Sequence, residues 1–228
     1  MALTNLGAPL TLGGAIGRGY VKGQYGGITS PIYVYEATPV AIDPNGIATS
    51  QAVAAPGDLT LDGALVTSGV ATMDIPRNVT LVSDSGTDST QVATVTGNDV
   101  YGIALVEDIT LTGTSTAQGL KAFKTVSQVA IDGTCVGSLL CGSGDKFGLP
   151  YRITVPGSLQ AFWDATWNSG SGTTTVGSAA TATATTGDVR GTYLPATESD
   201  GTRTLALWIY MSDVDTDSGL YGVTQYGG

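Results

Sequence analysis

Short apolar segments that alternate with polar residues recur along the chain from Leu59 onwards. A period of two is the period of a β-strand with one buried face. The segments follow one another about every 8–12 residues, with Gly, Asn or Asp between them, which is typical of a β-sandwich or barrel. The sequence therefore predicts an all-β fold, with a β-sandwich or a jelly-roll or barrel-like body. The clearest strand candidates are 71–75, 78–82, 90–96, 101–111 and 120–131.

The composition also favours strands. Only 12% of the residues are charged and 33 are glycine, whereas about 25% are charged in a typical soluble domain. Threonine fits pleated strands and glycine supplies the turns between them. A surface with so little charge is desolvated at low cost, as burial against partner subunits requires. A neutral surface of Thr and Ser without partners is an equally good interpretation.

Residues 1–57 differ from the rest and are predicted to form an extended N-terminal arm. They are rich in glycine and contain no long apolar run, and glycine costs up to about 1 kcal/mol at a helical position. Apolar side chains at intervals on an arm without a core of its own indicate docking onto a partner. The alternative is an ordinary N-terminal strand that adds to the protein's own sheet. The candidate contact residues are Leu3, Leu6, Leu10, Leu12, Tyr20 and Tyr25.

Residues 58–228 form the predicted β-rich body, which has two further features. The segment 157–166 is a candidate for one short helix, because Leu159, Phe162 and Trp163 have the i, i+3, i+4 spacing of a helix face. The segment from about 165 to 190 is rich in Thr, Ala and Gly. We expect this insertion to bury little and to project from the body.

The segment 204–212 is predicted to be a strand with apolar residues on both faces. One face carries Leu205, Leu207, Ile209 and Met211, and the other carries Ala206, Trp208 and Tyr210. Such a strand is either central in a sheet or lies at an interface. Trp208 and Tyr210 are therefore the candidate residues for a subunit interface.

The sequence contains no histidine. This excludes Ser-His-Asp and Cys-His nucleophiles, histidine-ligated zinc and imidazole acid–base catalysis. A carboxylate pair could still cleave glycosides, with Trp163, Trp167 and Trp208 lining a cleft. Buried tryptophans are the better explanation, because only 7% of the residues are aromatic. We expect a protein that is not an enzyme and that uses no cofactor.

Glu107 lies on the apolar face of the segment 101–111. A bulge that turns it outwards, or pairing with a cation, explains it better than catalysis does. Cys135 and Cys141 are expected to be buried and reduced, with a hairpin disulfide as the alternative.

Asp213, Asp215 and Asp217 resemble the start of a calcium loop. The later positions depart from the EF-hand pattern, since Ser218 replaces the glycine and Thr224 replaces the final glutamate. We expect a solvated acidic turn and no metal.

The net charge of −10 argues against nucleic-acid binding through phosphate neutralisation. The nine cations are scattered along the sequence, and no run approaches the roughly 20 apolar residues of a membrane span. The opening MALTNLGAPLTLGG lacks the basic and then apolar pattern of a secretory signal. We expect no nucleic-acid or membrane partner, and synthesis and assembly in a cytoplasm.

Four segments in the middle of the chain form an ordered set of motifs. They are TGNDVYG at 96–102, EDITLTGT at 107–114, GLKAFKTV at 119–126 and GDKFGLPY at 144–151. This set resembles virion structural proteins of tailed bacteriophages, and in particular capsid decoration proteins, also called cement or head-stabilising proteins. The resemblance spans about residues 59–155, which is under half of the chain.

The resemblance implies a β-rich protein, often a homotrimer, on the outer surface of the capsid. There it would bridge neighbouring subunits of the major capsid protein, and the N-terminal arm would be the clamp. The virion would be assembled in the host cytoplasm. The resemblance also implies structural roles for Gly97, Gly102 and Gly113 at turns, Phe123 in the core and Pro150 at a bend, and no catalytic residues.

A tail fibre or adhesin that binds host surface carbohydrate is the alternative. The insertion at about 165–190 would then be its tip. The long repeats or heptads of tail fibres are missing from the sequence. Copy number separates the two functions, because a decoration protein is present in ratio to the capsid subunit and a fibre in far fewer copies.

Overall fold

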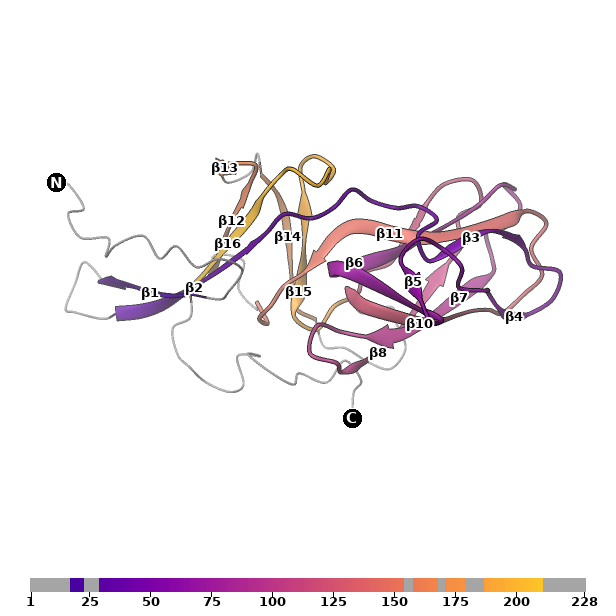
Figure 1. The fold of residues 1–228 in the computed structure, drawn as a ribbon, viewed down its shortest axis with the longest axis horizontal. Helices are drawn as coiled ribbons and strands as arrows, with labels where there is room; N and C mark the ends of the chain where they lie inside the picture. Colours follow the sequence, from indigo (N-terminus) through magenta and orange to yellow (C-terminus); the bar gives the residue numbers. More distant parts are fainter. Residues whose placement is uncertain (1–16, 23–28, 154–157, 168–170, 179–186, 211–228) are drawn as a thin grey trace.

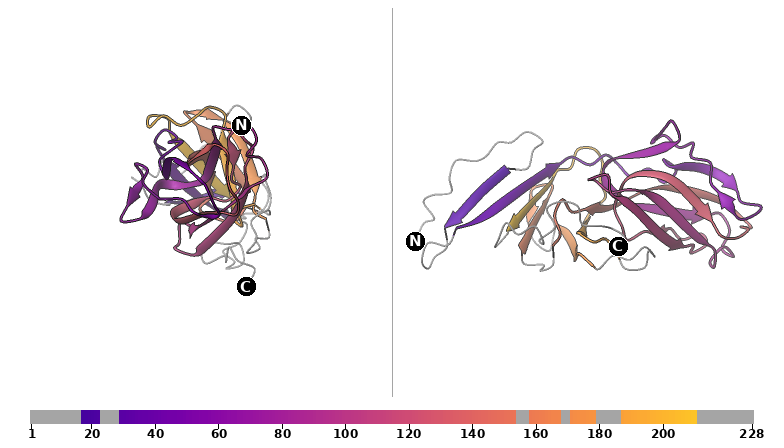
Figure 2. Two further views of the ribbon diagram at one scale, coloured as in Figure 1. Left: turned by 90° about the vertical axis from the view of Figure 1, so that its right-hand side faces the viewer. Right: turned by 90° about the horizontal axis from the view of Figure 1, so that it is seen from below.

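The computed structural model describes residues 17–22, 29–153, 158–167, 171–178 and 187–210. The regular elements within these ranges are β-strands, arranged in two antiparallel sheets. This confirms the predicted all-β fold. The molecule is elongated, with most of the larger sheet at one end and the β1–β2 hairpin at the other (Figures 1 and 2).

The smaller sheet has five strands in the order β1-β2-β16-β12-β13. The last six residues of β2 pair with β16, whereas its first six pair with β1, so the hairpin extends beyond the rest of the sheet (Figure 1). The strands are β1 (Gly17–Lys22), β2 (Thr29–Ala37), β12 (Leu159–Trp163), β13 (Thr166–Trp167) and β16 (Leu205–Tyr210).

The larger sheet follows the path β14-β15-β11-β6-β10-β7-β8, and four short strands pair beside it. Of these, β3 pairs with β11, β4 with β10, and both β5 and β9 with β6. The strands are β3 (Ala48–Ala52), β4 (Gly57–Asp58), β5 (Val66–Thr67), β6 (Val70–Ser83), β7 (Val92–Asn98), β8 (Ala104–Thr110), β9 (Ala117–Gln118), β10 (Phe123–Ile131), β11 (Ser138–Gly148), β14 (Gly172–Val176) and β15 (Gly191–Pro195).

Each sheet region has its own core. In the larger lobe, β3 to β11 enclose an aliphatic cluster that includes Ile47, Leu81, Val95 and Leu139. In the smaller lobe, the five-stranded sheet packs against β14, β15 and the end of β11 around an aromatic cluster. Phe147 and Trp163 join these two layers, with ring centroids 5.9 Å apart. The lobes are therefore two hydrophobic cores that share β11.

Part of the segment predicted as an arm belongs to the sheets. β2 is hydrogen-bonded to β16, and β3 is hydrogen-bonded to β11. Ile47 and Ala48 are fully buried in the core of the larger lobe. The region from β2 to β4 thus follows the alternative considered for 1–57, in which the strands add to the protein's own sheets.

The predicted helix at 157–166 is wrong, because Leu159–Trp163 is strand β12. Leu159, Ala161 and Trp163 are buried and alternate with Gln160 and Phe162, so the segment also satisfies the period of a strand. Pairing of the whole of β12 with residues 205–209 of β16 selects the strand over the helix. A tight turn follows, in which Asp164 and Ala165 both have positive φ, as in a two-residue type I′ hairpin.

The insertion predicted to project at about 165–190 is also different in the structure. Within it, β14 pairs with β15 and extends the larger sheet. Ser171, Asp188 and Arg190 are buried, and Asp188 accepts hydrogen bonds from the backbone N–H groups of Ala122 and Arg190. These buried polar contacts hold the described parts against the body. The Thr-Ala alternation at 181–185 lies outside the described residues.

The strand candidates 71–75 and 78–82 form one continuous strand, β6, with an irregularity at Pro76 and Arg77 between them. The register of β6 with β10 and with β11 shifts at this point. Proline lacks a backbone N–H, and such irregularities tolerate it. Gly102 and Gly113 have positive φ at turns and Phe123 is fully buried, as expected. Gly97 is instead inside β7, where a Cβ would lie 1.9 Å from the Thr125 carbonyl oxygen.

Candidate functional site

The outer face of the five-stranded sheet carries the predicted interface residues that the structure describes. β16 is central, between β2 and β12, and its residues Leu205, Leu207 and Ile209 are buried in the core. Trp208 points the other way and is 37% exposed. β16 is therefore central in its sheet and also contributes to an exposed apolar surface, because one of its faces lies in the core and the other carries Trp208.

Neighbouring strands extend this outer face. Trp208 lies opposite Val34 of β2 and Gln160 of β12, and its ring packs on Phe162 with centroids 5.0 Å apart. The Tyr210 hydroxyl donates a hydrogen bond to Gln160 Oε1 at 2.9 Å. We call Val34, Phe162, Trp208 and Tyr210 the aromatic face. The sequence identified Trp208 and Tyr210, but the contributions of Val34 and Phe162 depend on the strand order.

The structure describes few of the predicted arm contacts. Tyr20 is in β1, where it pairs with Pro31 of β2. The possible calcium loop at 213–217 lies outside the described residues. So do the other predicted arm contacts, which are Leu3, Leu6, Leu10, Leu12 and Tyr25.

A second candidate site is the buried polar seam where β8 faces the segment 118–122. Glu107 of β8 is almost fully buried, and its carboxylate accepts hydrogen bonds from the backbone N–H groups of Leu120 and Lys121. In return, Lys121 Nζ donates to the Val106 carbonyl oxygen at 3.0 Å. These side chains connect two segments that have few backbone contacts with each other. Glu107 thus points inwards, and the bulge that would turn it outwards is wrong.

Burial changes the acid–base properties of the seam. It raises the pKa of Glu107 to about 7, although the Leu120 and Lys121 N–H groups and the nearby charges of Lys121 and Lys146 act in the opposite direction. Burial also lowers the pKa of Lys121 and of Lys146, which the negative charge of Glu107 opposes. Burial therefore shifts the acid and the amines in the direction of their neutral forms.

The two lobes meet at a third set of buried charges, centred on Arg77. Its guanidinium contacts Asp74 at 2.7 Å and Asp145 at 3.3 Å, and donates to Ser199 Oγ and to the Val40 carbonyl oxygen. It also lies over the ring of Phe147, which belongs to the smaller core. Arg77 therefore connects loops of both lobes.

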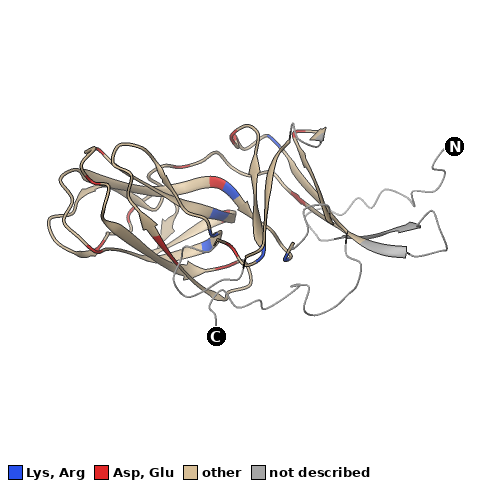
Figure 3. Ribbon diagram, turned by 180° about the vertical axis from the view of Figure 1, so that it is seen from behind, with Lys and Arg blue, Asp and Glu red and all other residues tan. Residues whose placement is uncertain are grey.

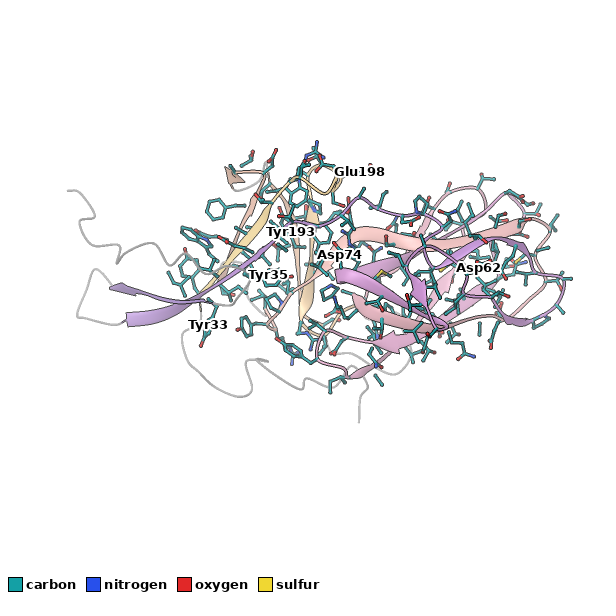
Figure 4. All side chains as sticks on the ribbon, viewed as in Figure 1. Tyr33, Tyr35, Asp62, Asp74, Tyr193 and Glu198 are labelled. Atoms are coloured by element: carbon teal, nitrogen blue, oxygen red, sulfur yellow. The ribbon has the colours of Figure 1, made fainter. Side chains whose placement is uncertain are left out.

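The Arg77 junction also affects nearby side chains. Burial would raise the pKa of Asp74, but the hydrogen bonds and charge of Arg77 hold it below its usual range. Burial, with Asp74 as a further negative charge, raises the pKa of Tyr35 to about 12. Asp74 and Tyr35 lie between the two lobes in Figure 4. A parallel pair, Arg190 with Asp99, is buried nearby, and Arg190 lies over the ring of Tyr101.

Several of the cations that are scattered in the sequence come together in the fold. Arg77, Lys121 and Arg190 are buried, and the Lys and Arg residues that are coloured in Figure 3 lie mostly near the junction of the lobes. Acidic residues are exposed around the periphery, at Glu36, Asp58, Asp62, Asp84, Asp132, Asp164, Glu198 and Asp200. The charged side chains that are exposed among the described residues of 29–210 are therefore acidic, whereas three of the cations are buried.

Two shallow grooves border the seam. One, of about 310 Å³, runs along β8 and is lined by Glu107, Ile109 and Leu120 among others. The other, of about 430 Å³, lies between Pro44, Lys146 and Thr197. Among the described residues, no group of three or more Cys, Asp or Glu is placed to hold a metal ion. Cys135 and Cys141 are both buried and free.

Within the described part of the chain, no helix is long and apolar enough to cross a membrane. Comparison with known proteins found no matching family model, curated protein or solved structure.

Proposed function

We propose that this chain is a virion structural protein that binds the outer surface of a bacteriophage capsid. It would stabilise contacts between major capsid protein subunits and would form a homotrimer assembled in the host cytoplasm. The observation that carries the proposal is the aromatic face, where the tilted rings of Phe162 and Trp208 pack together on the outside of a sheet whose inner side is already packed.

Two further features support an adhesive role. The exposed charges of the described residues are acidic, so a capsid surface with basic residues would attract the protein and nucleic acid would repel it. Large aromatic side chains that are partly exposed are enriched in the centres of protein interfaces. Repetition over a capsid lattice would strengthen each modest contact through avidity.

The subunit interface is tested by Trp208→Ala. Loss of its ring should remove a central contact of the aromatic face and shift the protein from trimer to monomer in multi-angle light scattering. Leu194→Ala is the matched control, because Leu194 is 43% exposed but lies on β15 outside this face. An unchanged oligomer in Trp208→Ala would contradict the assignment of the interface.

The clamp is tested by deleting residues 1–20. We expect a soluble, folded body that no longer co-sediments with expanded capsids. Full retention of capsid binding by the truncated protein would refute the clamp. Copy number in purified virions gives an independent check, since a decoration protein should number hundreds of copies per particle, in ratio to the capsid subunit.

A carbohydrate-binding tail protein is the second candidate, and the aromatic face also favours it. The Tyr210 hydroxyl and the Gln160 amide lie beside the Trp208 ring, and such an amphipathic surface can stack on a sugar and bond its hydroxyls. A copy number of a few dozen or fewer, with glycan binding that is lost in Trp208→Ala, would support this function over the first.

A further inference from the structure

Lys146 and Asn78 lie side by side in the polar seam. They belong to the neighbouring strands β11 and β6, at the place where the register of the two strands shifts. The Lys146 backbone N–H donates to Asn78 Oδ1 at 2.9 Å. Lys146 Nζ and Asn78 Nδ2 both donate to the Gly119 carbonyl oxygen, at 3.0 Å and 3.3 Å. The amine and the carboxamide thus converge on a single oxygen atom.

The carboxamide is held in place and protected from water. Asn78 is fully buried, and Nδ2 also donates to Gln118 Oε1 at 2.9 Å. Gly144 leaves the space for it, since a Cβ there would lie 2.9 Å from Asn78 Cγ. Exclusion of water favours attack by an amine over hydrolysis.

Glu107 is an acid whose negative charge acts on Lys146. Its Oε2 lies beside Gly119, where an added Cβ would approach it to 2.7 Å. Gly119 therefore has Glu107 next to its Cα and the Lys146 amine on its carbonyl oxygen. Burial favours the neutral amine of Lys146 and the protonated acid of Glu107, which are the forms that amide formation requires.

We propose that Lys146 and Asn78 react to form an intramolecular amide cross-link between β11 and β6, with Glu107 as the proton-transfer group. Lys146 Nζ leaves the Gly119 carbonyl and attacks Asn78 Cγ, so that a C–N bond forms and the carbonyl π bond opens. Glu107 donates a proton to the carboxamide oxygen and later takes the proton released by the attacking amine. Glu107 then passes that proton to Nδ2 and takes up the proton of the hydroxyl formed at the carboxamide oxygen, so that the carbonyl π bond re-forms, the Cγ–Nδ2 bond breaks and ammonia leaves.

The reaction is balanced without an oxidant or an added reactant, because a primary amine and a carboxamide give a secondary amide and ammonia. It does not depend on the proposed capsid function. The product would join two central strands covalently at the position where their hydrogen-bond ladder is interrupted.

The intact mass of the purified protein tests the proposal. We expect a mass about 17 Da below that of the sequence, which is the loss of one ammonia. The deficit should disappear in Lys146→Arg and in Asn78→Ala. Lys124→Arg is the matched control and should keep the deficit, because Lys124 Nζ is bound to the Met73 and Asp74 carbonyl oxygens elsewhere.

Glu107→Gln keeps both reacting groups and tests the proton transfer. In a time course after synthesis, the deficit should develop at least about 100-fold more slowly than in the unchanged protein. Circular dichroism would confirm that each variant is folded. A rate equal to that of the unchanged protein would overturn the role of Glu107.

Peptide mapping excludes other sources of the same mass. Protease digestion should release a branched peptide that joins the segment around Lys146 to the one around Asn78. Cyclisation of Asn45 onto Gly46 would also remove ammonia, but that deficit would persist in Lys146→Arg. A full sequence mass in the unchanged protein, a deficit that survives Lys146→Arg, or a branch at Lys121 would each overturn the proposal.

Discussion

The core of the larger lobe is almost entirely aliphatic, whereas the core of the smaller lobe is rich in aromatic side chains. Phe123 is the aromatic member of the first cluster. The second cluster is smaller and contains Tyr33, Phe147, Tyr151, Trp163 and Tyr193. Branched aliphatic side chains interdigitate closely inside a curled sheet. Each large aromatic ring instead buries a wide apolar area, so a lobe of only two layers can form its core from few residues.

The two lobes also differ in what they expose. The larger lobe encloses charged groups such as Glu107 and Lys121, while the smaller lobe presents the aromatic face to its surroundings. A buried charge fixes one arrangement of its neighbours, because each polar atom needs its partner. The comparison indicates a larger lobe that is complete in itself and a smaller lobe that is shaped for contact.

The largest expected effect is at the junction, in Arg77→Ala. This change leaves Asp74 and Asp145 without their buried cation and should lower the free energy of unfolding by about 3–5 kcal/mol. All three tryptophans lie in the five-stranded sheet, so their fluorescence reports the smaller lobe. In urea, the fluorescence transition should then precede the circular-dichroism transition.

The control for the junction is Arg203→Ala, because the Arg203–Asp200 pair is partly exposed to solvent and such surface pairs contribute little. Its two transitions should stay coincident. If Arg77→Ala also unfolds in one coincident transition at the original midpoint, the lobes do not depend on Arg77 for their coupling.

The next effect is the change of stability with pH that the buried carboxyl of Glu107 causes in the larger lobe. It is measured in the Lys146→Arg variant, in which the proposed cross-link cannot form. The pKa of Glu107 is raised from 4.5 to about 7 in the folded protein. Between these values the folded state keeps a proton that the unfolded chain releases, so stability falls as pH rises through this interval. The loss is on the order of 3 kcal/mol.

Adding Glu107→Gln to that variant should flatten the slope of unfolding free energy against pH between 4.5 and 7. The acids with lowered pKa act at lower pH and with the opposite sign, since their contribution is lost as pH falls. They are Asp62, Asp74, Asp88 and Asp200. A slope that is the same with and without the glutamate would show that Glu107 is not protonated in the folded state.

A smaller effect is expected for Gly119→Ala, also in the larger lobe. The new Cβ would lie 2.7 Å from Glu107 Oε2 and 2.9 Å from the Val79 carbonyl oxygen. Such overpacking should cost about 1–3 kcal/mol in chemical denaturation. Gly86→Ala is the matched control, because a Cβ at Gly86 meets no atom within 4 Å and should leave stability unchanged or slightly raised.

The smallest effect is in the turn of the smaller lobe, in Ala165→Gly. Ala165 has a φ of 61°, a region that glycine adopts without a steric penalty. The change should raise the midpoint of thermal unfolding, by up to about 1 kcal/mol in free energy. Ala130→Gly in the strand β10 should instead lower it, and a decrease in both variants would contradict strain at Ala165.

The sequence predicts this fold where the pattern of a single segment is sufficient. The alternation at 205–210 locates β16 and separates its buried face from Trp208. The same reasoning places Glu107 on an inward face. At 159–163, the same residues fit both the period of a helix and the period of a strand. Pairing with β16 decides in favour of the strand, and a local sequence pattern contains no information about that pairing.

The candidate sites were less predictable because they combine distant segments. Arg77 meets Asp145 and Ser199, which are 68 and 122 positions away. Lys146 and Asn78 are 68 positions apart and belong to strands whose adjacency follows from sheet order. Nothing in the local sequence around a cation shows which acid, amide or carbonyl it will reach.

The strand β11 belongs to both lobes, since it pairs with β3 and β6 in one and with β15 towards the other. A force that pulls the smaller lobe away from the larger would act along this strand. The ladder between β11 and β6 would then be loaded in shear, so that many hydrogen bonds resist together before any one breaks. Tension applied to the aromatic face would thus be carried through β11 into the ladder with β6.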